Sequence, residues 1–554
     1  MSIARTADLW WKNAIVYCLD VETFLDTDGD GTGDLTGLTA RLDHLAGLGV
    51  TCLWLMPFYP SPNHDDGYDI TDYYGVDERL GSHGDFVALV RTAKDRGMRV
   101  IVDLVVNHTS DQHPWFRSAK RSRTSRFRDY YVWRDEPQDD PHADVVFPDV
   151  EDSIWTHEER TDQYYLHHFY SHQPDVNIAN PRVRDEMAKV AGFWLQLGVD
   201  GFRIDAVPYL LETEGHACEL DLDPHGFLKD LRSFMARRKG DALLLGEVNL
   251  PTEELVAYFG DDQADELQLL FAFPLMQQMY LALARQDRTP MIEALAEMPH
   301  DSDDSQWAIF VRNHDELTLD QLSDDERDEV FAAFGPDESM QLFGRGLRRR
   351  LPPMLNGDQQ RIRMVYSLLF SLPGTPVLFY GEEIGMGENL DIDGRLAVRT
   401  PMQWTNDEGT AGFTTVPPSR MRRPLPGGRF GPLAVNVADQ ERDQDSLLNW
   451  MQRVIRRRRE TPEIGWGGWA VLDAGDDAVL AHRCDWEGRC FLAVHNLSDE
   501  PRQIELRLED EGELAVIDLL DTDGTPTPLD DGRLPLTLEG YGYRWMSLRP
   551  EDRP

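Results

Sequence analysis

The stretch Gly201-Phe-Arg-Ile-Asp-Ala-Val207 decides the fold of this chain. It follows a helix-like segment, Pro181–Leu197, after a short turn, so we interpret it as a strand that comes directly after a helix. Arg203 and Asp205 are two residues apart, which places both side chains on one face of that strand. Parallel α/β folds place their chemistry at the carboxyl ends of strands, where such charged groups are expected. A structural ion pair is the competing interpretation, because paired charges also occur without a function.

The composition is that of an ordinary globular protein with a strongly acidic charge. The 554 residues are 41% hydrophobic and 10% aromatic, and the formal net charge is −44. Nucleic-acid-binding proteins present a basic surface, so we exclude nucleic acid as a partner. No apolar run approaches membrane-spanning length and the N-terminus lacks a signal-peptide stretch, so we expect a cytoplasmic protein without a membrane partner. The five cysteines show no CxxC spacing and are expected to be free thiols.

Strand-like and helix-like segments alternate along most of the chain. One helix is expected from Leu38 to Leu48, because leucines recur there at helical spacing. Apolar strands are expected at residues 14–17, 51–56, 99–106, 201–206, 242–247, 307–311 and 376–380. Repeated strand–helix units predict a parallel sheet, and roughly eight units favour a closed (β/α)8 TIM barrel. An open dinucleotide-binding sheet is disfavoured, because no glycine fingerprint follows the first strand.

Two segments interrupt this alternation. Residues 108–171 are too long for an ordinary connection and are rich in Trp, Tyr, His and Asp, so we predict an inserted domain after the third strand. From residue 463 to residue 554, short alternating segments are separated by Gly, Asp and Pro turns, which predicts a C-terminal antiparallel β-sandwich. The catalytic barrel would then comprise residues 1–107 and 172–462.

Polar side chains follow several of the predicted strands. They are Asn107 and His108 after the third strand, Arg203 and Asp205 at the end of the fourth, Glu247 at the end of the fifth, and Arg312-Asn-His-Asp-Glu316 after the seventh. Because barrel strands converge at one rim, these groups should crowd one pocket. Phosphate chemistry would need a glycine-rich loop there, and metal-dependent hydrolysis a tighter histidine cluster. Several carboxylates with His and Arg partners suit the cationic transition state of glycoside cleavage.

The loop Asp26-Thr-Asp-Gly-Asp-Gly-Thr-Gly-Asp34 predicts a divalent-cation site. Carboxylates at alternate positions, with glycines that allow a tight turn, provide the hard oxygen ligands that calcium prefers. The loop is not an EF-hand, because its twelfth position is Gly37 and no helix precedes it. The expected ligands are Asp26, Asp28, Asp30, the carbonyl of Thr32, and Asp34, with calcium as the ion and magnesium as the alternative. A solvated acidic turn is the competing interpretation.

The sequence resembles the alpha-amylase family of glycoside hydrolases and transglycosylases. The resemblance is carried by Asp103-Leu-Val-Val-Asn-His108, Gly201-Phe-Arg-Ile-Asp-Ala206, Gly246-Glu247 and Asn313-His-Asp315, and it extends over essentially the whole chain. It implies a retaining mechanism with a covalent glycosyl-enzyme intermediate. Asp205 would be the nucleophile and Glu247 the general acid and then base, while Asp315 would hold sugar hydroxyls and stabilise the distorted transition state.

The resemblance also implies substrate-binding and metal-binding residues. For the donor glucose they would be Arg203 as the partner of Asp205, His108 and His314 at the hydroxyls, Asp65 and Tyr68 at the non-reducing end, and Arg399 as the residue that closes that end. A second calcium site would link the inserted domain to the barrel. Its ligands would be Asn107, Asp175, the carbonyls of Tyr209 and Leu210, and Glu212.

Longer stretches resemble the trehalose synthases within this family. They are Thr109-Ser-Asp-Gln-His-Pro-Trp-Phe116, Phe169-Tyr-Ser-His-Gln-Pro-Asp175, Ala206-Val-Pro-Tyr-Leu210, Arg312-Asn-His-Asp-Glu-Leu-Thr-Leu319 and Leu372-Pro-Gly-Thr-Pro-Val-Leu-Phe-Tyr-Gly381. Such enzymes interconvert maltose and trehalose, and they hydrolyse the substrate when water enters. Two segments, 17–24 and 389–398, depart from the expected pattern.

Two other functions stay open at this point. One is an α-glucosidase or glucosyltransferase that acts on short α-glucosides. The other is a non-catalytic carbohydrate-binding or partner subunit, which is disfavoured because Asp205, Glu247 and Asp315 are all present. The expected partner is a disaccharide or short oligosaccharide, no organic cofactor is expected, and assembly into a homo-oligomer is left open.

Overall fold

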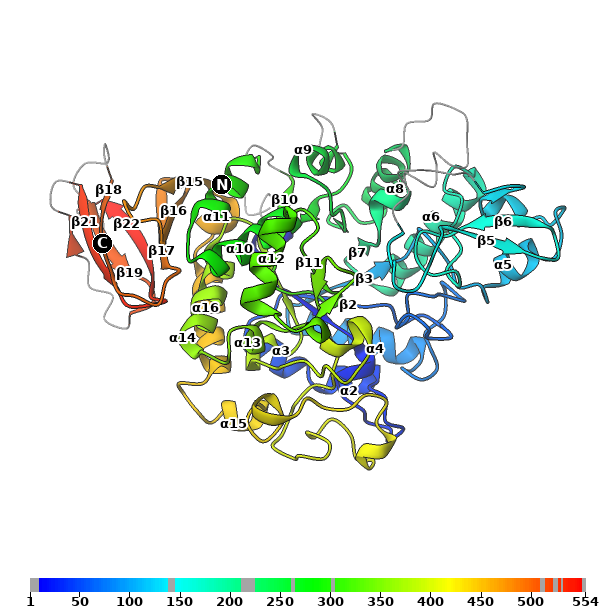
Figure 1. Cartoon of the computed structure of the whole chain (residues 1–554), viewed down its shortest axis with the longest axis horizontal. Coiled ribbons are helices and arrows are strands. Elements are labelled where there is room, and N and C mark those ends of the chain that lie inside the picture. Colours follow the sequence, from blue (N-terminus) through cyan, green and yellow to red (C-terminus); the bar gives the residue numbers. More distant parts are fainter. Residues whose placement is uncertain are drawn as a thin grey trace.

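The computed structural model describes residues 9–137, 145–210, 225–260, 265–299, 304–508, 514–521, 527–529 and 532–550. A closed barrel of parallel strands lies at its centre (Figure 1). In chain order the barrel strands are β1 Val16–Leu19, β2 Cys52–Leu55, β3 Arg99–Leu104, β7 Gly201–Ile204, β8 Leu243–Gly246, β9 Leu269–Phe271, β10 Gln306–Ile309 and β14 Thr375–Phe379. β1 pairs with both β2 and β14, which closes the ring and confirms the predicted barrel.

Helices follow the strands and cover the barrel (Figure 1). The longer ones are α4 His83–Asp95, α6 Pro181–Leu197, α8 Gly226–Ala236, α10 Phe273–Arg285, α11 Thr289–Glu297, α12 Asp324–Phe334, α14 Gln359–Ser371 and α16 Leu447–Glu460. α6 shows how the sequence sets such a unit. The Asn180 side chain accepts a hydrogen bond from the Arg182 amide, and Pro181 needs no intrahelical partner at the first position. Gly198, with a φ of 112°, ends the helix before β7.

Three local features differ from the predictions. The predicted strand over 201–206 ends at Ile204, so Asp205 and Ala206 lie just beyond it. The strand β9 was not predicted from its residues, because it is only three residues long. The single helix expected from Leu38 to Leu48 is divided into α2 Leu35–Ala40 and α3 Leu42–Leu48. Arg41 causes this break, because its amide donates to the carbonyl of Leu38, three residues back, and tightens the last turn of α2.

The segment between β3 and α6 forms a separate small unit. It holds α5 Pro114–Ala119 and an antiparallel sheet of β4 Trp133–Arg134, β6 Gln163–Leu166 and β5 Trp155–Glu158. Figure 1 shows this unit (cyan) at the end of the molecule opposite the C-terminal strands. Backbone bridges from His108 to Asp175 and from Tyr131 to Val176 connect its two ends. The unit therefore projects from the barrel at the carboxyl end of β3.

The C-terminal part consists of two antiparallel sheets. One contains β15 Gly468–Leu472, β16 Val479–Trp486, β17 Arg489–Asn496, β22 Tyr543–Pro550, β19 Leu514–Asp518 and β20 Thr527–Pro528. The other pairs β18 Arg502–Arg507 with β21 Arg533–Leu538. They enclose a hydrophobic core of their own, which includes Val479, Leu492, Leu506 and Leu538. This arrangement confirms the predicted antiparallel C-terminal domain.

Four cysteines, Cys18, Cys52, Cys484 and Cys490, are buried thiols that take part in no disulfide among the described residues, while Cys218 lies outside those residues. No helix in the described ranges has the length and apolar character needed to cross a bilayer.

Candidate active site

Arg203 joins the carboxylates at the carboxyl ends of three neighbouring strands. It lies on β7, directly opposite Asp103 of β3, and its side chain is 1% exposed. Its Nη1 contacts Asp103 Oδ1 at 2.6 Å and Asp205 Oδ1 at 2.5 Å, while its Nη2 contacts Glu247 Oε1 at 2.7 Å. The guanidinium therefore holds the predicted nucleophile and the predicted acid side by side. Its planar set of donors suits this task better than an ammonium group would.

The backbone just after β7 fixes the second oxygen of Glu247. Ala206 adopts a φ of 52°, which is uncommon for a residue other than glycine. Its amide donates a hydrogen bond to Glu247 Oε2 at 3.0 Å. Both carboxylate oxygens of Glu247 are thus held, one by Arg203 and one by this amide. Ala206 was not predicted as a site residue, and its sequence carries no signal of this role.

Asp315 lies in a ring of cationic and polar groups. Its Oδ1 accepts hydrogen bonds from Arg395 at 2.6 Å and from Arg399 at 2.8 Å. Its Oδ2 lies 3.1 Å from His314 Nε2, which is also 2.7 Å from the hydroxyl of Tyr68. The rings of Tyr68 and His314 are stacked, with centroids 5.6 Å apart. The structure thus brings together Tyr68, His314 and Asp315, as the sequence predicted.

Burial controls the protonation of the carboxyl groups at the site. Burial raises the pKa of Glu247 to about 7 and the pKa of Asp205 to about 6, and in both cases Arg203 acts in the opposite direction. Burial alone would raise the pKa of Asp315, but that pKa lies well below its usual value, because the hydrogen bond from His314 and the positive charges of Arg395 and Arg399 outweigh burial. Burial lowers the pKa of His314 to about 4, so this ring is neutral at pH 7. The site therefore combines a carboxylate that stays ionised with a glutamate able to carry a proton near neutrality.

The three carboxyl groups Asp205, Glu247 and Asp315 line a cavity of about 390 Å³. Its wall includes Asp65, Tyr68, His108, Asp205, Glu247 and Asp315. The ring nitrogen Nδ1 of His108 lies 3.1 Å from Asn107 Oδ1, while its Nε2 is buried without a protein partner in the described residues. That atom is therefore able to bond a ligand hydroxyl. The volume falls in the range of ordinary small-molecule pockets.

The contact expected between Asp65 and Arg399 is made by a different arginine. Arg395 reaches Asp65 Oδ1 at 2.6 Å, whereas Arg399 contacts Asp66 Oδ2 at 2.7 Å. The expectation that Arg399 closes the donor end beside Asp65 is therefore wrong in this detail, because Arg399 lies one layer behind the pocket wall. Arg395 belongs to the short 3-10 helix η7 Gly394–Val398, and Arg399 directly follows it, so one short element supplies both arginines.

Two aromatic rings from different parts of the chain contact each other, and one of them, Phe147, lines the cavity. Phe147 belongs to the inserted segment, and Phe343 connects β12 Gln341–Leu342 with β13 Gly346–Leu347. Their ring centroids are 5.0 Å apart, and the guanidinium of Arg395 lies 4.9 Å from the Phe147 ring. Phe147 lines the cavity and is 2% exposed. Neither ring was predicted as a site residue, because each lies far in sequence from the motifs that end the strands.

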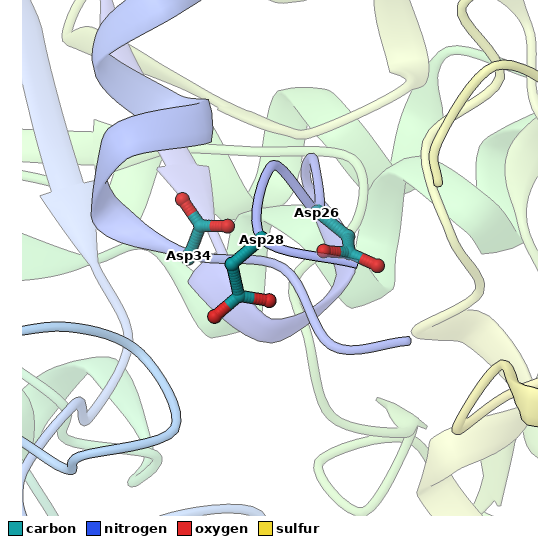
Figure 2. Close-up of side chains that lie close together, drawn as sticks. All are labelled: Asp26, Asp28 and Asp34. Atoms are coloured by element: carbon teal, nitrogen blue, oxygen red, sulfur yellow. The ribbon is translucent and has the colours of Figure 1, made fainter. Parts of the chain in front are cut away.

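The acidic loop before α2 brings some of its predicted ligands together. Asp26, Asp28 and Asp34 each offer a carboxylate oxygen within 4.8 Å of the others (Figure 2). The carboxylate of Asp30 instead accepts a hydrogen bond from the Thr32 amide at 2.7 Å, and it lies outside this group. The pKa of Asp28 is raised, first by burial and then by repulsion from Asp30. An oxygen-only, negatively charged set of this kind fits a hard cation such as calcium.

The second predicted metal site is only partly described. The amide of Val176 donates to the carbonyl of Asn107 at 2.7 Å, which brings Asn107 next to Asp175. The carboxylate of Asp175 pairs with His168 Nδ1 and is fully buried. Tyr209 and Leu210 lie at the end of a described stretch, and Glu212 lies outside the described residues. This site stays a prediction.

Comparison with known proteins identifies relatives along the whole chain. The family model described as Alpha amylase, catalytic domain, matches residues 20–332 and 348–467. The model described as Sucrose hydrolase-like, C-terminal domain, matches residues 488–547.

Individual relatives cover nearly the full length. The trehalose synthase/amylase TreS of Mycolicibacterium smegmatis is 43% identical over 557 residues, covering 98% of this chain and 93% of that protein. The trehalose synthase of Pimelobacter sp. is 40% identical over 571 residues, covering 100% and 99%. A crystal structure of a variant of the trehalulose synthase MutB, in complex with Tris, matches 97% of this chain and 100% of its own, with 28% identity and a TM-score of 0.77.

Proposed function

The chain belongs to the alpha-amylase family, and we propose that it interconverts maltose and trehalose through a covalent glucosyl-enzyme. The observation that carries this proposal is that the guanidinium of Arg203 contacts both Asp205 and Glu247. Beside them, the ion pair of Arg395 with Asp65 closes the end of the pocket that would bind the donor glucose. The curated trehalose synthases that resemble the whole chain support the same reaction. Partial hydrolysis is expected from the same intermediate whenever water reaches it.

In the first step Asp205 attacks the anomeric carbon of the donor glucose. Glu247 gives its proton to the oxygen of the leaving glucose as the glycosidic bond breaks, so the intermediate is a glucosyl ester of Asp205. Arg203 keeps Asp205 in its charged, nucleophilic form by pairing with it, which opposes the effect of burial. Asp315, held ionised by its basic partners, accepts hydrogen bonds from ring hydroxyls and favours the cationic transition state.

In the second step the freed glucose must attack through a different hydroxyl. Glu247, now ionised, removes a proton from the anomeric hydroxyl of the freed glucose. The oxygen of that hydroxyl attacks C1 of the bound glucosyl group, the ester bond to Asp205 breaks, and trehalose forms with Asp205 again a carboxylate. The pocket must keep the glucose inside and water outside during this exchange. The contact between Phe147 and Phe343 supports such retention, because it joins the inserted segment to the β12–β13 turn at the cavity wall.

The walled donor end supports a substrate of short length. Arg395 bridges Asp65 and Asp315, and Gln173 donates to the other oxygen of Asp65 at 2.9 Å. A chain extended beyond the donor glucose would have to displace this partly buried ion pair. An open groove for long polymers is therefore not favoured in this part of the pocket.

We also propose that the loop of Asp26, Asp28 and Asp34 holds calcium. The ion would relieve the mutual repulsion of these carboxylates and anchor the loop against the barrel. Asp26 already contacts the hydroxyl of Thr414, so the ion would act at the junction between this loop and the segment near residue 414. Its effect is expected on stability, because Asp26, Asp28 and Asp34 do not line the cavity that contains Asp205.

The test of the reaction is a time course with maltose. The purified protein is incubated with maltose, and trehalose and glucose are separated by chromatography, with Asp205→Asn as the inactive control. Trehalose that accumulates ahead of glucose supports the isomerase. Glucose alone would contradict it and would leave an α-glucosidase, and equal rates for Asp205→Asn and the parent would contradict the assigned nucleophile.

A further inference from the structure

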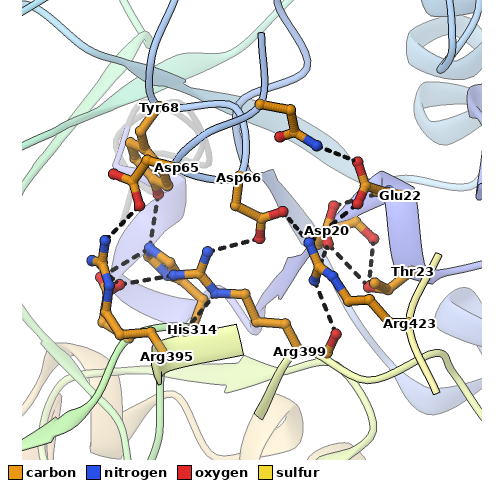
Figure 3. Close-up of polar contacts among 12 residues, drawn as sticks. Asp20, Glu22, Thr23, Asp65, Asp66, Tyr68, His314, Arg395, Arg399 and Arg423 are labelled. Atoms are coloured by element: carbon orange, nitrogen blue, oxygen red, sulfur yellow. Dashed lines mark hydrogen bonds and ion pairs between the residues drawn. The ribbon is translucent and has the colours of Figure 1, made fainter. Parts of the chain in front are cut away.

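A buried row of alternating charges lies behind Asp315. Arg399 donates through Nη2 to Asp315 Oδ1 at 2.8 Å and through Nη1 to Asp66 Oδ2 at 2.7 Å. The other oxygen of Asp66 contacts Nη2 of Arg423 (Figure 3). The side chains of Arg399, Asp66 and Arg423 are 1%, 4% and 6% exposed. The row thus runs from Asp315 through Arg399 and Asp66 to Arg423.

Arg423 is fixed at its far end by several acceptors. Its Nη1 donates to the carbonyl of Arg399 at 3.0 Å and to Asp20 Oδ2 at 3.3 Å. Its Nη2 also donates to Glu22 Oε1 at 3.2 Å. A guanidinium held by three carboxylates and a carbonyl has one well-defined orientation, because its donors lie in a fixed plane.

The two sequence segments that depart from the expected family pattern, 17–24 and 389–398, both lie close to this row. Asp20 and Glu22 directly follow β1 and belong to segment 17–24, while Arg395 lies in segment 389–398. Figure 3 shows Asp20 and Glu22 on one side of Asp66, and Arg395 with Asp65 on the other. The two segments therefore act on opposite sides of the same turn of the chain.

The backbone at Asp66 separates the pocket from this row. Asp66 adopts a φ of 52°, so it and its neighbour Asp65 point in different directions. Asp65 faces Arg395 and lines the cavity, whereas Asp66 faces Arg399 and does not line the cavity in the described part of the chain. The side chain of Asp66 is therefore linked to Asp315 through Arg399.

We propose that Asp66 and Arg423 are positioning residues for Asp315, acting through Arg399. They hold the Arg399 guanidinium where it meets Asp315 Oδ1 and where its Nε donates to the carbonyl of His314 at 2.7 Å. With Oδ1 so held, Oδ2 is directed to His314 and the pocket. Loss of the Asp66 charge leaves Arg399 with one carboxylate fewer, so its guanidinium and Asp315 are free to shift. The inference rests on the proposed role of Asp315.

The test compares Asp66→Asn, Arg423→Lys and Arg423→Met with the parent. Asp66→Asn is the sharpest variant, because asparagine tolerates the left-handed backbone at this position while it removes the charge and one of the two acceptor oxygens that Arg399 and Arg423 use. We expect kcat for total maltose consumption to fall about 10- to 100-fold, as for other residues that orient a catalytic group. KM should change less than about threefold, because the lost interaction acts mainly in the transition state. Arg423→Lys, which keeps the charge, should fall between the parent and Arg423→Met.

The matched control is Arg422→Met. Arg422 pairs with the same Glu22 at 2.5 Å, but its side chain is 39% exposed and it has no ion pair with Asp66 in the described part of the chain. Its kcat should equal that of the parent. An equal loss of kcat in Arg422→Met would overturn the proposal, because it would assign the effect to the general stability of this acidic cluster.

A second readout distinguishes positioning from loss of fold. A cationic glucose-like iminosugar, 1-deoxynojirimycin, resembles the charge of the transition state, and its affinity is measured by calorimetry. Asp66→Asn and Arg423→Lys should bind it at least about tenfold more weakly, a change of about 1.4 kcal/mol, while melting remains cooperative. Iminosugar affinity and kcat within twofold of the parent would overturn the proposal.

The failure of the proposed isomerase is recognised separately. If the parent releases only glucose from maltose, the isomerase is wrong, but the same kcat comparison on glucose release still tests the positioning residues. If the parent consumes no maltose, the iminosugar titration alone decides. A parent that also fails to bind the iminosugar would overturn both proposals.

Discussion

Ala206 donates its backbone N–H to Glu247 Oε2 across 3.0 Å from a left-handed backbone conformation. Holding a residue other than glycine in this conformation costs of order 1–3 kcal/mol, and such strain persists where the surrounding structure imposes it. The turn directs the amide at the carboxylate, while Arg203 holds the other oxygen at 2.7 Å. The strained turn directly after the nucleophile therefore fixes the position of the proposed acid.

The first prediction concerns the pH dependence of kcat/KM. Burial raises the pKa of Asp205 to about 6 and the pKa of Glu247 to about 7. Activity needs Asp205 ionised and Glu247 protonated, so it should fall below about pH 6 and above about pH 7. The acid and alkaline limbs of the pH profile report the titration of the two interacting carboxyl groups as a pair. Initial rates of maltose consumption across pH 4.5–9 would measure them.

The variant Glu247→Gln identifies the alkaline limb. It cannot lose a proton in this range, so the fall above pH 7 should disappear while the maltose rate drops by at least about 100-fold. An aryl α-glucoside with a good leaving group needs less help from an acid, so its rate of enzyme glucosylation should drop less. An alkaline limb that persists in Glu247→Gln would contradict the assignment.

The second prediction concerns the ring contact between Phe147 and Phe343. Removing one ring by Phe343→Ala should open the wall and let water reach the glucosyl-enzyme. We expect the ratio of glucose to trehalose to rise several-fold, with total consumption of maltose changed less than about threefold. Product chromatography from maltose measures both quantities. Phe343→Leu keeps most of the apolar volume and serves as the control, and an unchanged product ratio in Phe343→Ala would contradict a role in retention.

The barrel and the central site residues could be predicted because their signals are local. Arg203, Asp205 and Glu247 lie at or directly after apolar strands, so their common rim follows from the parallel fold itself. The alternation of strands and helices, with caps such as Asn180 and Gly198, is equally local. Short elements escape this reasoning, as β9 shows, because three buried residues have no distinct period.

The remaining contacts could not be predicted because they depend on how distant loops fold against one another. Arg395 and Asp65 are 330 positions apart, and their sequence surroundings do not indicate which arginine faces which aspartate. Asp66 forms an ion pair with Arg399 because the left-handed backbone of Asp66 directs its side chain away from the pocket. The resemblance implied closure by Asp65 and Arg399, but Asp65 pairs with Arg395, since the turn at Asp66 sets which arginine each aspartate faces.

The third prediction concerns calcium at the acidic loop. Saturation at 100 times the dissociation constant stabilises a protein by about 2.7 kcal/mol, so calcium should raise the melting temperature of the chelator-treated protein. Asp28→Asn should reduce this increase, because Asp28 belongs to the carboxylate group. Asp30→Asn should have a smaller effect, because the Asp30 carboxylate lies outside this group. Calorimetric melting with and without calcium measures the shift, and an equal shift in Asp28→Asn and the parent would contradict the site.

The last prediction concerns Arg395, which bridges two carboxylates at the donor end. Arg395→Met removes charge-assisted bonds to Asp65 and Asp315 and leaves both carboxylates without that partner. Loss of a partner that orients a catalytic group commonly costs about 10- to 100-fold, so kcat/KM for maltose should fall by about that factor. The donor end should also open, so the rate on maltotriose relative to maltose should increase.

Arg348→Met is the matched control for this experiment. Arg348 donates to the carbonyls of Ile392 and Leu390 at 2.8 and 2.9 Å, so it holds the same loop without reaching either carboxylate. If the loop alone mattered, both variants would lose activity to the same extent. A selective loss in Arg395→Met, with the shift toward maltotriose, would assign the effect to the ion pair at the donor end. Unchanged preference between the two substrates would contradict the proposed closure, because the partly buried bridge would then not limit chain length.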